Sequence, residues 1–149
     1  MPNYLETTVN KFIFKVADDR SYTQEGVWAL AEGNRIRIGL SDFQQQRNGD
    51  VAFAEVKPAG TQLAFDDEVA VIETIKVDIS LGSPVAGRVV ETNPSMDDAP
   101  DTINLDPYGS GWMAVIEAGD WENDRRRLMD PQAYFTYMKT QAEEEVTKG

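Results

Sequence analysis

The stretch that decides the fold is Val71-Ile72-Glu73-Thr74-Ile75-Lys76-Val77-Asp78-Ile79, a run of β-branched and alternating residues with one lysine near its middle. It is part of a longer segment, 69–79, that contains neither glycine nor proline. This segment is about twice the usual strand length of roughly 5 to 6 residues. Two structures therefore fit it: one long strand, or two strands with a turn between them.

The position of Lys76 differs between these two structures. In one long strand, Glu73 and Lys76 are solvent-facing residues, and the pattern alone favours this interpretation because solvated lysines are the rule. A type I turn accepts almost any residue, so a tight turn at 74–77 needs no glycine or proline. That turn would place Lys76 at a protruding tip. Periodicity does not decide between the two.

Short strands separated by proline and glycine surround this segment. A turn at Glu32-Gly33-Asn34 predicts a hairpin, and the intervals between the other strands are typical of a small sandwich or barrel. The fold class predicted from these strands is mainly β. The expected strands span 28–31, 35–40, 51–56, 62–63, 68–79, 87–92 and 112–116.

Two helices interrupt this β pattern. Ser41 or Asp42 can cap a short internal helix over 43–47, which Asn48-Gly49 would end. Asp130-Pro131 combines an N-cap residue with proline at the first helical position, and aromatic residues follow at helical spacing. The sequence therefore predicts a C-terminal helix that packs on the sandwich by its aromatic face.

The expected organisation is one structural unit with additions at both ends. Residues 1–20 are predicted to be an N-terminal extension, either an appended segment or an extra edge strand. Residues 21–129 form the main domain, and 130–149 form the C-terminal helix on that same domain. The stretch 93–107 contains several prolines and acids without periodicity, so a long surface loop with little regular structure is expected there.

The charge of the chain limits its partners. There are 26 acidic and 14 basic residues among 149, which gives a formal net charge of −12. Such a surface repels phosphate backbones and anionic membranes, so neither nucleic acid nor a membrane is expected as a partner. No apolar run approaches the roughly 18 residues of a membrane span, and the start lacks the regions of a signal peptide. We expect a cytoplasmic protein.

The absence of histidine and cysteine limits the chemistry. It removes imidazole bases, thiolate nucleophiles, disulfides and the commonest soft metal ligands together. Carboxylate or lysine chemistry, a bound cofactor, or no chemistry by the protein itself are what remain. We predict no enzyme, since no nucleophile and base can be paired.

Six blocks of sequence, in this order and spacing, resemble the H-protein family of the glycine cleavage system, which are lipoyl carriers. The resemblance extends from about residue 21 to the final helix. The blocks are Tyr22-Thr23 with Trp28, Ile36 to Phe43, Gly49 to Phe53, Val71 to Lys76, Ser83 to Asn93, and Asp106 to Trp112.

This resemblance implies that Lys76 bears covalent lipoate at the tip of a tight hairpin in a barrel-sandwich hybrid. It also implies that Glu73 helps the lipoylating enzyme, a lipoate ligase or lipoyl-assembly enzyme, to accept the domain, and that Gly87 allows the opposite turn. The implied partners of the carrier are glycine decarboxylase, aminomethyltransferase and dihydrolipoamide dehydrogenase. A tethered carrier needs no catalytic residue of its own.

Three features depart from the family pattern. Gly26-Val27 stands where H-proteins usually carry a His-Glu pair, Val77 replaces the small residue after the lysine, and the extension with Phe12 and Phe14 is additional. Lipoate-binding proteins of sulfur oxidation, which work with a heterodisulfide-reductase-like complex, also resemble H-proteins. The extension and the absent histidine favour that branch, with glycine cleavage as the alternative.

Two further alternatives concern the lysine itself. A biotin carrier uses a similar hairpin, but methionine usually flanks a biotinyl lysine, and here Ile75 and Val77 do. An unmodified interaction module would keep the fold without the arm, and would function normally after Lys76→Ala.

Overall fold

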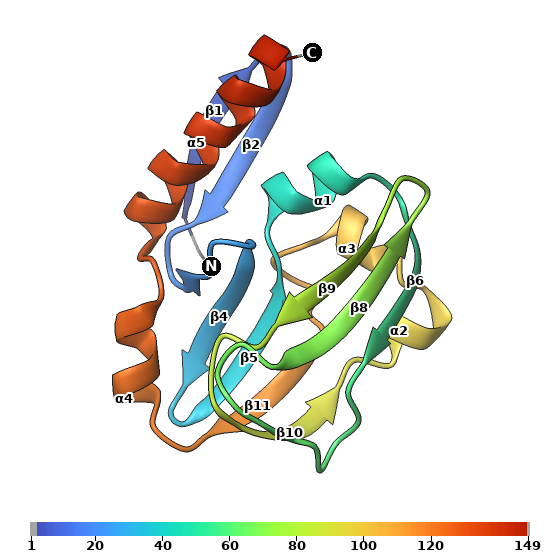
Figure 1. Ribbon diagram of the computed structural model, residues 1–149, viewed down its shortest axis with the longest axis vertical. Helices are drawn as coiled ribbons and strands as arrows, with labels where there is room; N and C mark the ends of the chain where they lie inside the picture. The colour runs from blue at the N-terminus through green and yellow to red at the C-terminus, as the bar shows by residue number, and fades with distance from the viewer. Residues whose placement is uncertain (1–2, 149) are drawn as a thin grey trace.

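Two antiparallel β-sheets enclose the main core of the protein. The computed structural model describes residues 3–148 (Figure 1). The smaller sheet has the order β6 (Val51–Val56), β8 (Glu68–Thr74) and β9 (Asp78–Gly82). The larger sheet has the order β3 (Ser21–Tyr22), β4 (Val27–Glu32), β5 (Arg35–Leu40), β11 (Ala114–Ala118), β10 (Gly87–Thr92) and β7 (Gln62–Leu63).

Each sheet contributes one face to this core. Ile36, Ile38 and Ile116 of the larger sheet and Ile72 and Leu81 of the smaller one are almost completely buried and belong to one cluster. Alternate residues of these strands point the other way, as the two-residue period of a strand requires. The predicted mainly β fold is therefore confirmed.

The two predicted helices begin where their caps indicated. The Ser41 hydroxyl accepts a hydrogen bond from the Gln44 amide at 3.3 Å, and α1 (Asp42–Asn48) ends at Gly49, whose φ is +86°. The carboxylate of Asp130 accepts from the Ala133 amide at 2.7 Å at the start of α5 (Pro131–Lys148). Residue 149 of the predicted range lies outside the described residues.

The prediction of a loop with little regular structure at 93–107 is wrong. This segment contains two short helices, α2 (Ser95–Asp98) and α3 (Thr102–Leu105). Met96 and Ile103 project from these helices into the main core and are buried. Helices of a single turn are unstable alone, so tertiary burial of these two side chains is what stabilises them. Two further short helices, α4 (Trp121–Asp124) and the 3-10 helix η1 (Arg125–Arg127), lead to α5.

The N-terminal extension is a hairpin and not an edge strand. Strands β1 (Tyr4–Val9) and β2 (Phe12–Ala17) pair with each other, and within residues 3–148 neither joins another sheet. Asn10 and Lys11 form the turn with φ values of 46° and 77°, the left-handed pair that two-residue hairpin loops prefer. Figure 1 shows the hairpin running alongside α5, away from the two sheets. The division at residues 20 and 129 remains a prediction, and residues 1–2 lie outside the described part.

A second hydrophobic cluster joins the hairpin, α1 and α5 to the outer side of the larger sheet. Tyr22 and Tyr134 stack at its centre with ring centroids 4.4 Å apart. The Tyr134 and Ser41 hydroxyls are hydrogen-bonded at 2.8 Å, and burial raises the pKa of the Tyr134 phenol above its usual range. The phenol therefore stays neutral in the core. The cluster comprises Val9, Phe14, Val16, Tyr22, Trp28, Phe43, Tyr134, Met138 and Ala142.

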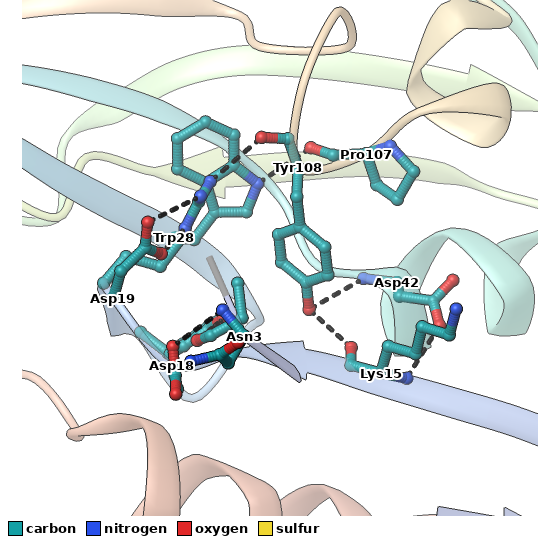
Figure 2. Close-up of polar contacts among 11 residues, drawn as sticks. Asn3, Lys15, Asp18, Asp19, Trp28, Asp42, Pro107 and Tyr108 are labelled. Atoms are coloured by element: carbon teal, nitrogen blue, oxygen red, sulfur yellow. Dashed lines mark hydrogen bonds and ion pairs between the residues drawn. The ribbon is translucent and has the colours of Figure 1, made fainter. Parts of the chain in front are cut away.

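Polar contacts fix the hairpin to the rest of the chain (Figure 2). The Tyr108 hydroxyl donates to the Lys15 carbonyl at 2.7 Å and accepts from the Asp42 amide at 3.3 Å. The Asp42 carboxylate in turn accepts from the Lys15 amide at 2.9 Å. Because these bonds involve the backbone of β2 and the first residue of α1, they hold the two elements in one relative position.

Candidate functional site

Lys76 lies at the tip of the hairpin between β8 and β9. The Thr74 amide donates to the Val77 carbonyl at 2.8 Å, which closes the turn. The Thr74 hydroxyl oxygen accepts from the amides of Lys76 at 3.2 Å and Val77 at 3.0 Å. The segment 69–79 is therefore two strands with a tight turn at 74–77, and the interpretation as one long strand is wrong. The Thr74 side chain stabilises that turn, so it needs neither glycine nor proline.

The tip is open to solvent. Lys76 is exposed, Ile75 is 76% exposed and Val77 is 45% exposed. None of the ion pairs found within residues 3–148 involves Lys76. An exposed amine without a carboxylate partner is accessible to an enzyme that acylates it.

Two acids stand at the base of this tip. Glu73 is the last residue before the turn. It lies directly opposite Asp78 in the pairing of β8 with β9, and both side chains are exposed. Like charges at directly opposite positions destabilise a strand pair slightly. This arrangement places two negative charges below the lysine, one on each strand.

A groove of about 780 Å³ runs from the lysine between α1 and α5. The stem of Lys76 lies beside the end of α1, since a Cβ at Gly49 would be 3.7 Å from Lys76 Cε. Most of the residues that line it carry polar or charged side chains, among them Gln24, Glu25, Gln44, Asn48, Asp78 and Gln141, so we refer to it as the polar groove. Val77, Ile79 and Leu81 add apolar surface to its walls.

Sequence reasoning missed two residues that border this groove. Arg47 of α1 and Glu145 of α5 form an ion pair at 2.6 Å across it. Both side chains are 43% exposed, so the pair contributes at most about 1 kcal/mol to stability. They are almost a hundred residues apart in the chain, and no local pattern relates them. Only the packing of α5 beside α1 brings them together.

The Gly26 position has no room for a histidine. Its φ is +84°, and a Cβ there would overlap Gln44 Cγ and lie 2.9 Å from both the Ser41 and Tyr134 hydroxyl oxygens. Val27 is fully buried in the main core. The space that a histidine side chain at residue 26 would need is therefore filled by side chains of α1, of its N-cap residue and of α5.

Gly87 does not form a turn, contrary to what the resemblance implies. It begins β10, pairs with Leu63 and Ala118, and has no left-handed φ. A Cβ at this position would overlap the carbonyl oxygen of Glu117 in the neighbouring strand. Glycine is needed here because two backbones approach closely, and not because a turn requires it.

Other types of site are not indicated by the geometry. Within residues 3–148, no group of three or more Asp or Glu side chains is placed to hold a metal ion. None of the helices described in that range is both long and apolar enough to cross a membrane.

Known proteins are similar to this chain in sequence and in fold. A family model described as the glycine cleavage H-protein matches residues 20–141. The glycine cleavage system H protein of Anaeromyxobacter sp. (strain K) is 39% identical over 127 residues, which cover 85% of this chain and 98% of that protein. A probable glycine cleavage system H protein of Pyrococcus horikoshii is 34% identical over 128 residues, 85% of this chain and 95% of that protein.

A solved structure agrees with these relatives. The crystal structure of a glycine cleavage system H protein from Mycobacterium marinum superimposes with a TM-score of 0.74 at 26% identity. The superposition covers 81% of this chain and 97% of that one. The barrel-sandwich fold is thereby confirmed. This chain belongs to the glycine cleavage H-protein family, whose members carry covalent lipoate on a lysine and are not themselves catalysts.

Proposed function

We propose that Lys76 bears the lipoyl group and that this chain carries the aminomethyl unit of glycine cleavage. The observation that supports this most is the exposed amine of Lys76, which has no ion pair with any of residues 3–148 and stands on a turn held by Thr74. Joined to Lys76 Nζ through an amide, lipoate would supply a disulfide that accepts the unit on one sulfur as its S–S bond breaks, and that is left as a dithiol once the unit is released. The chain itself positions and tethers it.

The proposed partners follow from this role. They are a lipoate ligase or lipoyl-assembly enzyme, glycine decarboxylase, aminomethyltransferase and dihydrolipoamide dehydrogenase. A tether of this kind replaces diffusion by a high local concentration at each partner's site. The net charge of −12 suits docking to basic surfaces, and it would raise association rates at low salt.

The sequence-based preference for sulfur oxidation lacks support from the comparisons. The relatives and the structure described above are all H proteins of glycine cleavage by description. The departure at Gly26, which favoured the other branch, is accommodated locally by Gln44, Ser41 and Tyr134. Glycine cleavage is therefore the better-supported function, and a heterodisulfide-reductase-like partner is not proposed.

An exchange assay tests this function. Purified lipoylated protein, incubated with glycine decarboxylase, is expected to support exchange of the glycine carboxyl with bicarbonate at a rate comparable to that of a standard H protein. The unlipoylated chain is the control and should support none. A lipoylated protein that dihydrolipoamide dehydrogenase reduces and reoxidises, but that supports no exchange, would retain the arm and overturn the assignment to glycine cleavage.

The proposed role of Glu73 gives a separate prediction. Glu73→Gln should slow lipoylation by a lipoate ligase about tenfold, which corresponds to about 1.4 kcal/mol of lost recognition. Intact mass measured over time at a fixed ligase concentration gives the rate. Asp78→Asn is the matched control, because it removes the same charge at the directly opposite position. Equal rates for the two variants would show that only the net charge matters and that Glu73 has no specific role.

A further inference from the structure

A second pocket, of about 360 Å³, opens beside Lys76 and shares Lys76, Arg47 and Glu145 with the polar groove. Its walls are mostly apolar and come from three elements that are distant in sequence. The hairpin provides Val9, Phe12 and Phe14, α1 provides Phe43, and α5 provides Ala142 and Val146. We refer to it as the aromatic pocket.

Phe12 is the exposed wall of the aromatic pocket. It shares a strand face with Phe14 and Val16, which are buried against the second cluster. Phe12 stacks on Phe14 at 6.3 Å between centroids, and Phe14 meets the edge of Phe43 at 5.3 Å. Phe12 nevertheless remains 56% exposed. The apolar face of the hairpin that packs on the second cluster therefore continues to Phe12, where no other part of the chain that the structure describes buries it.

Lys76 lies on the boundary between the aromatic pocket and the polar groove. It lines both, as do Arg47 and Glu145, the ion pair that bridges α1 and α5. A group attached to Lys76 Nζ can therefore turn to either side without any movement of the hairpin tip. Of the two, the aromatic pocket has the larger apolar share of its walls.

We propose that the lipoyl group on Lys76 docks its dithiolane ring in the aromatic pocket. This inference rests on the proposed function, in which Lys76 bears lipoate. Acylation removes the charge of Lys76, so the attached chain and ring are apolar and gain from leaving water. Sulfur also makes favourable contacts with aromatic rings, and Phe12, Phe14 and Phe43 supply them. Because the ring is tethered beside the pocket, weak affinity is sufficient to populate the docked state.

The pocket is preformed, and most of its apolar wall residues lie outside the matched family region. The bonds of Tyr108 and Asp42 to Lys15 fix β2 against α1, so little ordering accompanies docking. The family match covers residues 20–141, whereas the hairpin, Ala142 and Val146 lie outside it. The docked ring is shielded from small reductants and must leave the pocket to reach a partner enzyme.

Nuclear magnetic resonance of the full-length protein, with and without lipoate on Lys76, tests docking directly. Intact mass first establishes the lipoyl increment, and its absence would overturn the proposed function and this inference together. With the increment present, amide shifts are expected at Phe12, Phe43 and Val146. Shifts confined to residues 74–78, or shifts that appear only at high protein concentration because a second copy binds, would overturn docking alone.

Reduction kinetics provide the matched comparison of variants. Phe12→Ala removes a wall of the pocket, and Ile13→Ala, 50% exposed on the opposite face of the same strand, is the control. If about two-thirds of the arms are docked, the lipoyl disulfide of Phe12→Ala should be reduced by a small phosphine about threefold faster than that of wild type. Ile13→Ala should match wild type. Equal rates in all three proteins would overturn docking.

Discussion

Replacing Lys76 by arginine is expected to abolish lipoylation and, with it, all turnover in a reconstituted glycine cleavage reaction. A guanidinium stays protonated at any pH the protein tolerates, so it offers no free nitrogen lone pair to form the amide. The fold should not change, because Lys76 is exposed at a turn that Thr74 stabilises. Substitutions at such surface positions usually alter the free energy of unfolding by less than about 0.5 kcal/mol.

Intact mass after incubation with lipoate ligase measures this effect. Wild type should gain one lipoyl increment and Lys76→Arg none. Lys57→Arg is the matched control, since Lys57 is also an exposed lysine, directly after β6, and its side chain is 45% exposed beside Glu68. A lipoyl increment on Lys76→Arg would place the arm elsewhere. Normal glycine cleavage by Lys76→Ala would instead identify the chain as an unmodified interaction module.

The lysine-bearing turn could be predicted only in part from its own residues. Thr74, Ile75, Lys76 and Val77 contain no strong turn former, and a type I turn accepts them as readily as a strand does. The excessive length of 69–79 indicated a break, but its place depended on resemblance to known carriers. The structure adds the physical reason, which is that the Thr74 hydroxyl accepts from two amides of the turn.

Other parts of the fold depended on contacts that the sequence does not display. Helices α2 and α3 are too short to form from propensity, and burial of Met96 and Ile103 stabilises them. Strand β1 was not expected, because its partner is the adjacent β2 and not a sheet strand. The aromatic pocket unites β2, α1 and α5, and no local spacing relates those elements.

The largest expected loss of stability comes from a substitution in the core sheet, Gly87→Ala. A Cβ at Gly87 would overlap the Glu117 carbonyl oxygen and lie 2.9 Å from the Glu117 carbonyl carbon, both of them backbone atoms. The backbone cannot easily shift, because the Ala86 amide donates to the buried carboxylate of Asp124 at 2.8 Å and the Ala86 carbonyl accepts from Gly119 at 3.1 Å. Overpacking of this kind should cost about 3 kcal/mol.

Thermal unfolding followed by circular dichroism should therefore show a Tm about 10 °C lower for Gly87→Ala than for wild type. Gly119→Ala is the matched control: Gly119 follows β11, has no left-handed φ, and a Cβ there would meet nothing within 4 Å. If both variants unfold at the wild-type Tm, the two strands can separate enough to admit a methyl group. If only Gly87→Ala is destabilised, yet its folded fraction is lipoylated at the wild-type rate, the close approach of β10 and β11 supports the fold and plays no part in presenting Lys76.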